Sequence, residues 1–110
     1  MITRIWHART TNENADAYER LLKTDIFPGI ASRNMSGYRG ISLVRRDVEG
    51  EVEFITIMWF DSPESVRQFA GEDATLAVVP AKARALLSRF DERSAHYETL
   101  VPPPLASNLR

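Results

Sequence analysis

The side chains best suited to exchange a proton near neutral pH are His7 and His96, because the unperturbed pKa of histidine is about 6.5. His7 lies in an alternating N-terminal segment and is a candidate general base; a hydrogen-bonded histidine near a strand end is the alternative. His96 lies in the most weakly patterned segment, where a lone exposed histidine is the simpler interpretation. Two histidines far apart in sequence, without clustered carboxylates, do not indicate a metal site.

Few other groups suggest catalysis. The chain contains no cysteine, which excludes disulfide bonds, thiolate metal sites and a cysteine nucleophile. No Gly-x-Ser-x-Gly motif supports a serine nucleophile, and no glycine-rich loop predicts a nucleotide or flavin site. We therefore expect neither a metal nor a cofactor. Arg4 would need a carboxylate partner if it pointed inward, and a position at a rim or an interface is the alternative.

Composition indicates a soluble globular domain rather than a disordered chain. Of the 110 residues, 44% are hydrophobic and 26% are charged. The net charge of -1, with acids and bases interspersed, gives no basic surface for nucleic acid or membrane. No apolar run approaches the roughly 20 residues of a membrane span, and the N-terminus does not resemble a signal peptide. We expect a cytoplasmic location.

The segment 53–61 reads as a central strand because it is rich in β-branched and aromatic residues. Successive side chains of a strand point to opposite faces. Here both faces are apolar: one carries Ile55, Ile57 and Trp59, and the other carries Phe54, Thr56, Met58 and Phe60. A strand buried on one face only should alternate apolar with polar residues. We therefore expect the sheet to be covered on both sides.

The predicted elements follow the order β-α-β-β-α-β. Strands are expected at 2–9, 38–47, 53–61 and 90–100, with helices from about 11 to Pro28, from Asp61–Ser62 to Gly71, and again from Pro80. This order fits an α+β, ferredoxin-like antiparallel sheet with helices on one face. Residues 1–100 then form one domain, and 101–110, with three successive prolines, form an extended C-terminal tail.

A homodimer is expected from the same pattern. Two helical segments can cover only one face of the sheet, and the predicted uncovered face carries Phe54, Met58 and Phe60, with Trp6 beside them. Monomers rarely leave such an apolar patch open to water. A two-fold partner that packs sheet against sheet would cover it.

Six short segments of the chain resemble the antibiotic biosynthesis monooxygenase domain family of the dimeric α/β-barrel superfamily. They are Trp6-His7-Ala8-Arg9-Thr10, Ala15-Asp16-Ala17-Tyr18-Glu19, Ile26-Phe27-Pro28-Gly29-Ile30, Glu53-Phe54-Ile55-Thr56, Met58-Trp59-Phe60-Asp61-Ser62 and Phe69-Ala70-Gly71-Glu72-Asp73. The resemblance covers about residues 1–100. It implies a dimer with facing sheets, and its members include cofactor-independent oxygenases, haem-degrading enzymes and isomerases.

Haem degradation is disfavoured within this resemblance. In that branch of the family an Asn on the first strand, a Trp on the third strand and a His on the second helical region carry the chemistry. Trp59 matches the Trp position, but the first-strand position is His7 and the region 74–87 contains no histidine.

The resemblance implies a cofactor-independent monooxygenase acting on an aromatic or quinol-like substrate in a pocket between helices and sheet. His7 would be the base and Trp59 an aromatic wall; for Trp59, a core tryptophan with its N–H hydrogen-bonded is the alternative. Ile57, Phe27 and Phe69 would line the pocket. These roles require His7, Ile57 and Trp59 to point toward the helices. The alternative is a non-catalytic dimer that binds a ligand or serves an accessory role.

Overall fold

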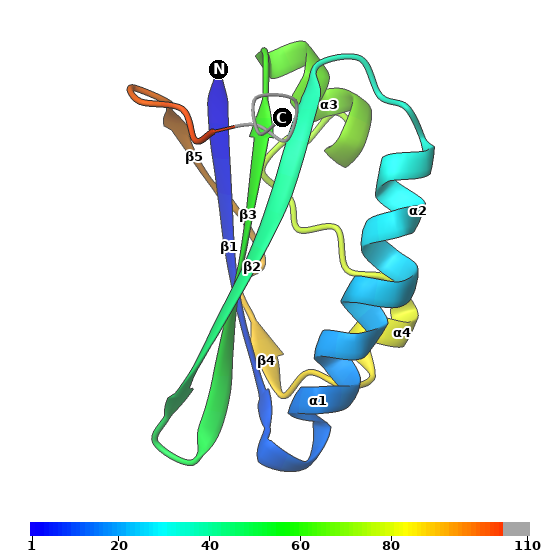
Figure 1. The fold of residues 1–110 in the computed structure, drawn as a ribbon, viewed down its shortest axis with the longest axis vertical. Helices are drawn as coiled ribbons and strands as arrows, with labels where there is room; N and C mark the ends of the chain where they lie inside the picture. The colour runs from blue at the N-terminus through cyan, green and yellow to red at the C-terminus, as the bar shows by residue number, and fades with distance from the viewer. Residues whose placement is uncertain (105–110) are drawn as a thin grey trace.

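One antiparallel sheet forms the body of the computed structural model, which describes residues 1–104 (Figure 1). Its long strands are β1 (Ile2–Thr11), β2 (Tyr38–Val48) and β3 (Glu51–Phe60), and its short ones are β4 (Arg89–Phe90) and β5 (Ala95–Glu98). The strands lie in the order β2-β3-β1-β4, and β5 also pairs with β1. The α+β, ferredoxin-like architecture predicted from the sequence is confirmed. Most of the predicted tail, residues 105–110, lies outside the described part.

The predicted last strand, 90–100, is two short strands instead of one. Between them the backbone bonds to the loop before α4: Ala77 N–H donates to Glu92 O at 2.9 Å, and Ser94 N–H donates to Thr75 O at 2.7 Å. Asp91 N–H still donates to His7 O of β1 at 3.0 Å, but residues 92–94 bond to the loop before α4 instead, so the ladder along β1 is interrupted.

All helices lie on one face of the sheet (Figure 1). They are α1 (Asn12–Leu21), the π-helical turn η1 (Leu22–Ile26), α2 (Phe27–Ser32), α3 (Pro63–Ala70) and α4 (Ala81–Arg84). Thr11 caps α1 by accepting from Asn14 N–H, and Ser62 caps α3 by accepting from Ser65 N–H. Within residues 1–104, no helix has the length and apolar character needed to cross a membrane.

The first helix does not stop at Pro28. Proline removes one backbone donor from a helix, and the sequence therefore predicts a kink or an end there. The chain instead widens the preceding turn, so that Phe27 N–H bonds to the carbonyl of Leu22, and α2 then continues past the proline. Such π-helical turns occur often at functional sites.

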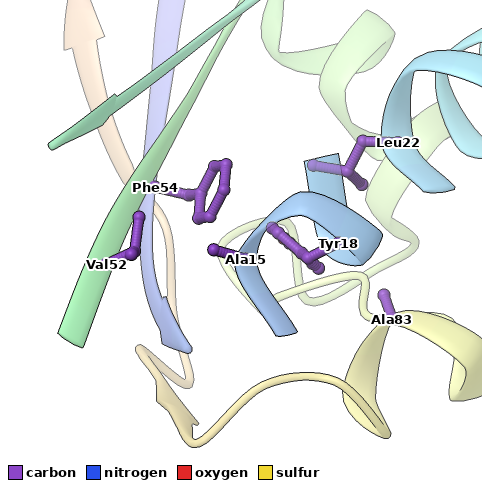
Figure 2. Packing of buried hydrophobic residues seen from close by; sticks show 6 residues of the cluster. All are labelled: Ala15, Tyr18, Leu22, Val52, Phe54 and Ala83. Atoms are coloured by element: carbon purple, nitrogen blue, oxygen red, sulfur yellow. The ribbon is translucent and has the colours of Figure 1, made fainter. Parts of the chain in front are cut away.

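The helices cover the face of β3 that carries Phe54, Met58 and Phe60, which are 1%, 4% and 0% exposed. Phe54 packs edge-on against Tyr18 of α1 with ring centroids 4.9 Å apart (Figure 2). The expectation that these three side chains face a partner subunit is therefore wrong. Because both faces of the strand are apolar, alternation groups the residues correctly but does not say which group the helices cover.

The uncovered face carries the other set. Cross-strand pairing joins Ile5 with Ile57 and His7 with Ile55, and these side chains are half-buried. Val44 and Tyr97 are exposed at 48% and 56%. The sheet thus keeps an apolar open face, although it is the opposite face from the one expected.

We expect Phe54→Ala to lower the free energy of unfolding by about 3–5 kcal/mol, because it leaves a cavity against Tyr18. Val44→Ala, on the open face, should cost less than about 1 kcal/mol. Urea denaturation of dilute protein checks both changes. Equal losses would contradict the assignment of the covered face.

Candidate functional site

A pocket lies between the sheet and the helices. Its cavity volume is about 60 Å³, and the empty space around its walls is about 530 Å³ when open solvent is included. Its walls are mainly apolar and come from every layer of the fold: Arg4, Trp6, Tyr18, Leu22, Ile26, Phe27, Ile30, Ile41, Thr56, Met58, Phe69, Val78, Val79, Pro80, Ala83 and Ser94. A concave, apolar site with a few convergent polar groups is the usual form of a small-molecule site.

Trp6 of β1 supplies an aromatic part of this wall. Its indole N–H donates to the carbonyl of Asp91 at 2.7 Å, in the interruption between β4 and β5. Its ring lies 5.7 Å from that of Phe90. The indole is therefore held in place by one hydrogen bond and one aromatic neighbour, and it presents a fixed apolar surface to the pocket.

Arg4 is the one basic side chain in the pocket wall, and it is only 3% exposed. Its guanidinium donates to the carbonyls of Ala74 and Leu76 and bonds to His96 Nε2 at 2.8 Å. It also lies 5.5 Å from the ring centre of Phe69. No carboxylate within residues 1–104 forms an ion pair with Arg4, and burial lowers its pKa to about 10.

Tyr18 gives the pocket a phenolic hydroxyl. The residue is 1% exposed, and burial raises its pKa, so the hydroxyl stays protonated and can donate. The hydroxyl has no hydrogen-bond partner within residues 1–104, whereas every fully enclosed side-chain N or O atom of those residues has one. The hydroxyl therefore touches space that a small molecule can reach. Thr56, which pairs with Trp6 across the strands, adds a second hydroxyl to the wall.

His96 supports Arg4 from β5. The two residues are cross-strand partners, and burial, followed by the positive charge of Arg4, lowers the pKa of His96 below 6.5. The neutral ring accepts the bond from Arg4 through Nε2. Within residues 1–104, no group of three His, Asp or Glu side chains is placed to hold a metal ion.

The structure separates the site residues proposed from the sequence. Phe27 and Phe69 line the pocket. His7, Ile57 and Trp59 share a face as expected, but that face is the open one. The expectation that these three point toward the helices is therefore wrong, for the reason given for Phe54.

His7 lies in a separate surface hollow. That hollow is lined by Ala8, Phe90 and the charged residues Arg9, Glu53, Arg89 and Asp91. The side chain of His7 is 44% exposed, with Nδ1 3.6 Å from the Asp91 carboxylate. It therefore does not reach the pocket between the sheet and the helices.

Arg4 and Tyr18 line the pocket in place of His7, Ile57 and Trp59, and the sequence gives some indication of both. Arg4 interrupts the apolar face of β1 that also carries Trp6, and a charge in such a position indicates either a rim or a site. Tyr18 belongs to the apolar face of α1, and its phenolic hydroxyl gives that face a hydrogen-bond donor. Periodicity does not show that Arg4 and Tyr18 line the same pocket, because that depends on how α1 packs over the sheet.

These features define a ferredoxin-like α+β domain with a mainly apolar pocket between its two layers. A solved structure from Chloroflexus aurantiacus J-10-fl, named as a candidate antibiotic biosynthesis monooxygenase, is similar with a TM-score of 0.61 and 22% identity, over 96% of this chain and 98% of that one. A Bacillus cereus structure with a corresponding name has a TM-score of 0.51 and 16% identity, over 93% and 91%. At these identities the likeness establishes the shared fold.

Comparison with protein-family models gives no match. The search of curated proteins likewise gives none. The resemblance to the monooxygenase family noted from the sequence is thus supported at the level of the fold.

The lowered pKa of His96 predicts a loss of stability in mild acid. Below pH 6.5 the unfolded chain binds the proton of His96 more readily than the folded chain does. This contribution to stability is therefore complete above pH 6.5 and is lost as the pH falls toward the lowered pKa. His96→Gln keeps an acceptor for Arg4 and should flatten that decline in urea unfolding measured across this range.

The carboxylates contribute to the pH dependence only in stronger acid. The pKa of Asp61, for example, is lowered from 3.8 by its bond to Arg39. An unchanged pH profile between about pH 5 and 6.5 in the Gln variant would contradict the assignment to His96.

Proposed function

We propose that the protein is a member of the antibiotic biosynthesis monooxygenase family that oxidises an aromatic or quinol-like small molecule with molecular oxygen, without a cofactor. The observation that carries the proposal is the pocket itself. It combines aromatic walls suited to a planar ring with four polar side chains that can bond to oxygen atoms: Arg4, Tyr18, Thr56 and Ser94. The fold shared with two candidate monooxygenases supports the same class.

The reaction needs an electron-rich substrate more than it needs a protein acid or base. The substrate is first deprotonated, either at a CH₂ group next to an aromatic ring or at a phenol. The resulting anion passes one electron to O₂, and the substrate radical and superoxide then combine at carbon to form a peroxide. Loss of water then leaves a carbonyl, so that R₂CH₂ and O₂ give R₂C=O and H₂O. Among residues 1–104, no carboxylate and no histidine lines the pocket. Its polar groups therefore stabilise the substrate anion, and solvent at the mouth takes the first proton.

Tyr18→Phe tests the site without disturbing the core. The ring and its contact with Phe54 remain, and only a hydroxyl without a hydrogen-bond partner in residues 1–104 is removed, so stability should be unchanged or slightly higher. Oxygen uptake with reduced quinols should fall by about 2- to 10-fold, the value of one neutral hydrogen bond. An oxygen electrode and thermal unfolding measure the two effects.

His7→Ala is the matched control, because His7 lies on the open face and should leave the rate unchanged. The proposal fails if a panel of quinols and polyphenols gives no oxygen uptake above blank with wild-type protein. Ligand binding without uptake would favour the non-catalytic alternative.

We also propose that the protein is a homodimer joined through its open sheet face. Half-buried Ile5, Ile55, Ile57 and Trp59, with exposed Val44, form an apolar surface at the centre of that face. A second copy packing sheet on sheet would remove it from water, at about 25 cal/mol for each Å² of apolar area buried. The pocket lies on the other side of the sheet and stays accessible in such a dimer.

Ile57→Glu should convert the dimer to a monomer at micromolar concentration, because it places a charge in the middle of the apolar face. Arg20→Glu, on the exposed side of α1, introduces the same side chain and should leave the dimer intact. Light scattering coupled to gel filtration distinguishes the two species. A wild-type monomer would overturn the assembly proposed here.

A further inference from the structure

We propose that the pocket selects ligands that carry a negative charge, and that Arg4 binds that charge. The ligand class is an ionised aromatic acid: a planar ring bearing a carboxylate, an enolate or an acidic phenolate. This inference rests on the proposed use of the pocket for small aromatic molecules, and it adds the charge of the ligand and the residue that reads it.

The hydrogen bonds of Arg4 leave part of its guanidinium unused. A guanidinium has five N–H donors and no acceptor. Nη1 bonds to Ala74 O and His96, and Nη2 bonds to Leu76 O. Nε–H and the second Nη2 hydrogen therefore have no acceptor within residues 1–104. Since no fully enclosed nitrogen of these residues lacks a partner, Nε reaches open space, and the space that Arg4 lines is the pocket.

The charge of Arg4 is equally unbalanced. The three acceptors it does contact are two carbonyls and an imidazole kept neutral by burial and by Arg4 itself. Asp73, which directly precedes Ala74 in the sequence, is instead bound by both Nη atoms of Arg93. A buried cation without a counter-ion is costly. An anionic ligand supplies the missing charge and two acceptors in the planar geometry that arginine favours.

The surroundings of Arg4 explain why the anion should be aromatic. The ring of Phe69 lies 5.5 Å from the guanidinium, and Trp6, Phe27 and Met58 complete the wall. The cavity volume of about 60 Å³ is smaller than the 150 Å³ of an engineered cavity that binds benzene. An aromatic ligand would therefore be enclosed only in part, with its acidic group at Arg4 and the rest of its ring partly in open solvent.

The test compares 2-naphthoate with its uncharged analogue 2-naphthamide by isothermal titration calorimetry. Wild-type protein should bind the carboxylate at least about 10-fold more tightly, the value of a charge-assisted hydrogen bond. Arg4→Met should abolish that preference. Arg9→Met is the matched control, because Arg9 lies on the same strand but lines the surface hollow of the open face, and it should keep the preference.

The comparison of the two compounds with wild-type protein does not depend on how well a variant folds. Arg4→Gln provides a second variant, and circular dichroism checks that it is folded. The proposal is overturned if wild-type protein binds both compounds equally, if it binds neither at millimolar concentration, or if a folded Arg4 variant keeps the preference. Preferential binding of naphthoate with no oxygen uptake from any quinol would support the charge preference and contradict the proposed oxidation. Oxygen uptake with equal binding of the two compounds would support the oxidation and contradict the charge preference.

Discussion

The contact between the aromatic face of β3 and the underside of α1 and α3 is the interaction on which the rest of the structure depends. Phe54 against Tyr18 and Phe60 against Phe69 fix the helices over the sheet at two separated points. Because these two aromatic contacts lie toward opposite ends of β3, the helices stay separated from the sheet between them. The pocket occupies that separation, so its position follows from the positions of the large aromatic side chains.

Much of the architecture is legible in the sequence because it depends on local chemistry. Thr11, Ser62 and Gly71 mark the helix ends through capping and backbone conformation, and alternation groups the residues of β1 and β3 into faces. Which face the helices cover depends on how they pack, and a strand with two apolar faces does not reveal this in its sequence. The sequence therefore places His7, Ile57 and Trp59 in the pocket, where the structure does not have them. Phe27 and Phe69 belong to the helices themselves and do line it.

The partners of Arg4 are a second feature that the sequence does not predict. Its place among apolar residues is visible in the sequence, and so is the need for a partner if it points inward. That no carboxylate of residues 1–104 meets it is a property of the folded chain, because Asp73, His96 and the carbonyls of 74 and 76 come from distant segments. The proposed function therefore rests on a charge that the described fold leaves without a counter-ion, and the likeness to known structures, being one of fold, does not extend to that side chain.

The π-helical turn η1 gives the first helix a built-in adjustment of length. An α-helix turns by about 100° for each residue, and a π-helical turn closes with one residue more, so the five residues 22–26 turn through nearly the angle of four α-helical ones. Deleting one of them would restore ordinary winding and leave Tyr18 on one side of the turn, and Phe27 and Ile30 on the other, close to their present directions. Related domains whose first helix is one residue shorter could therefore keep the same cavity wall.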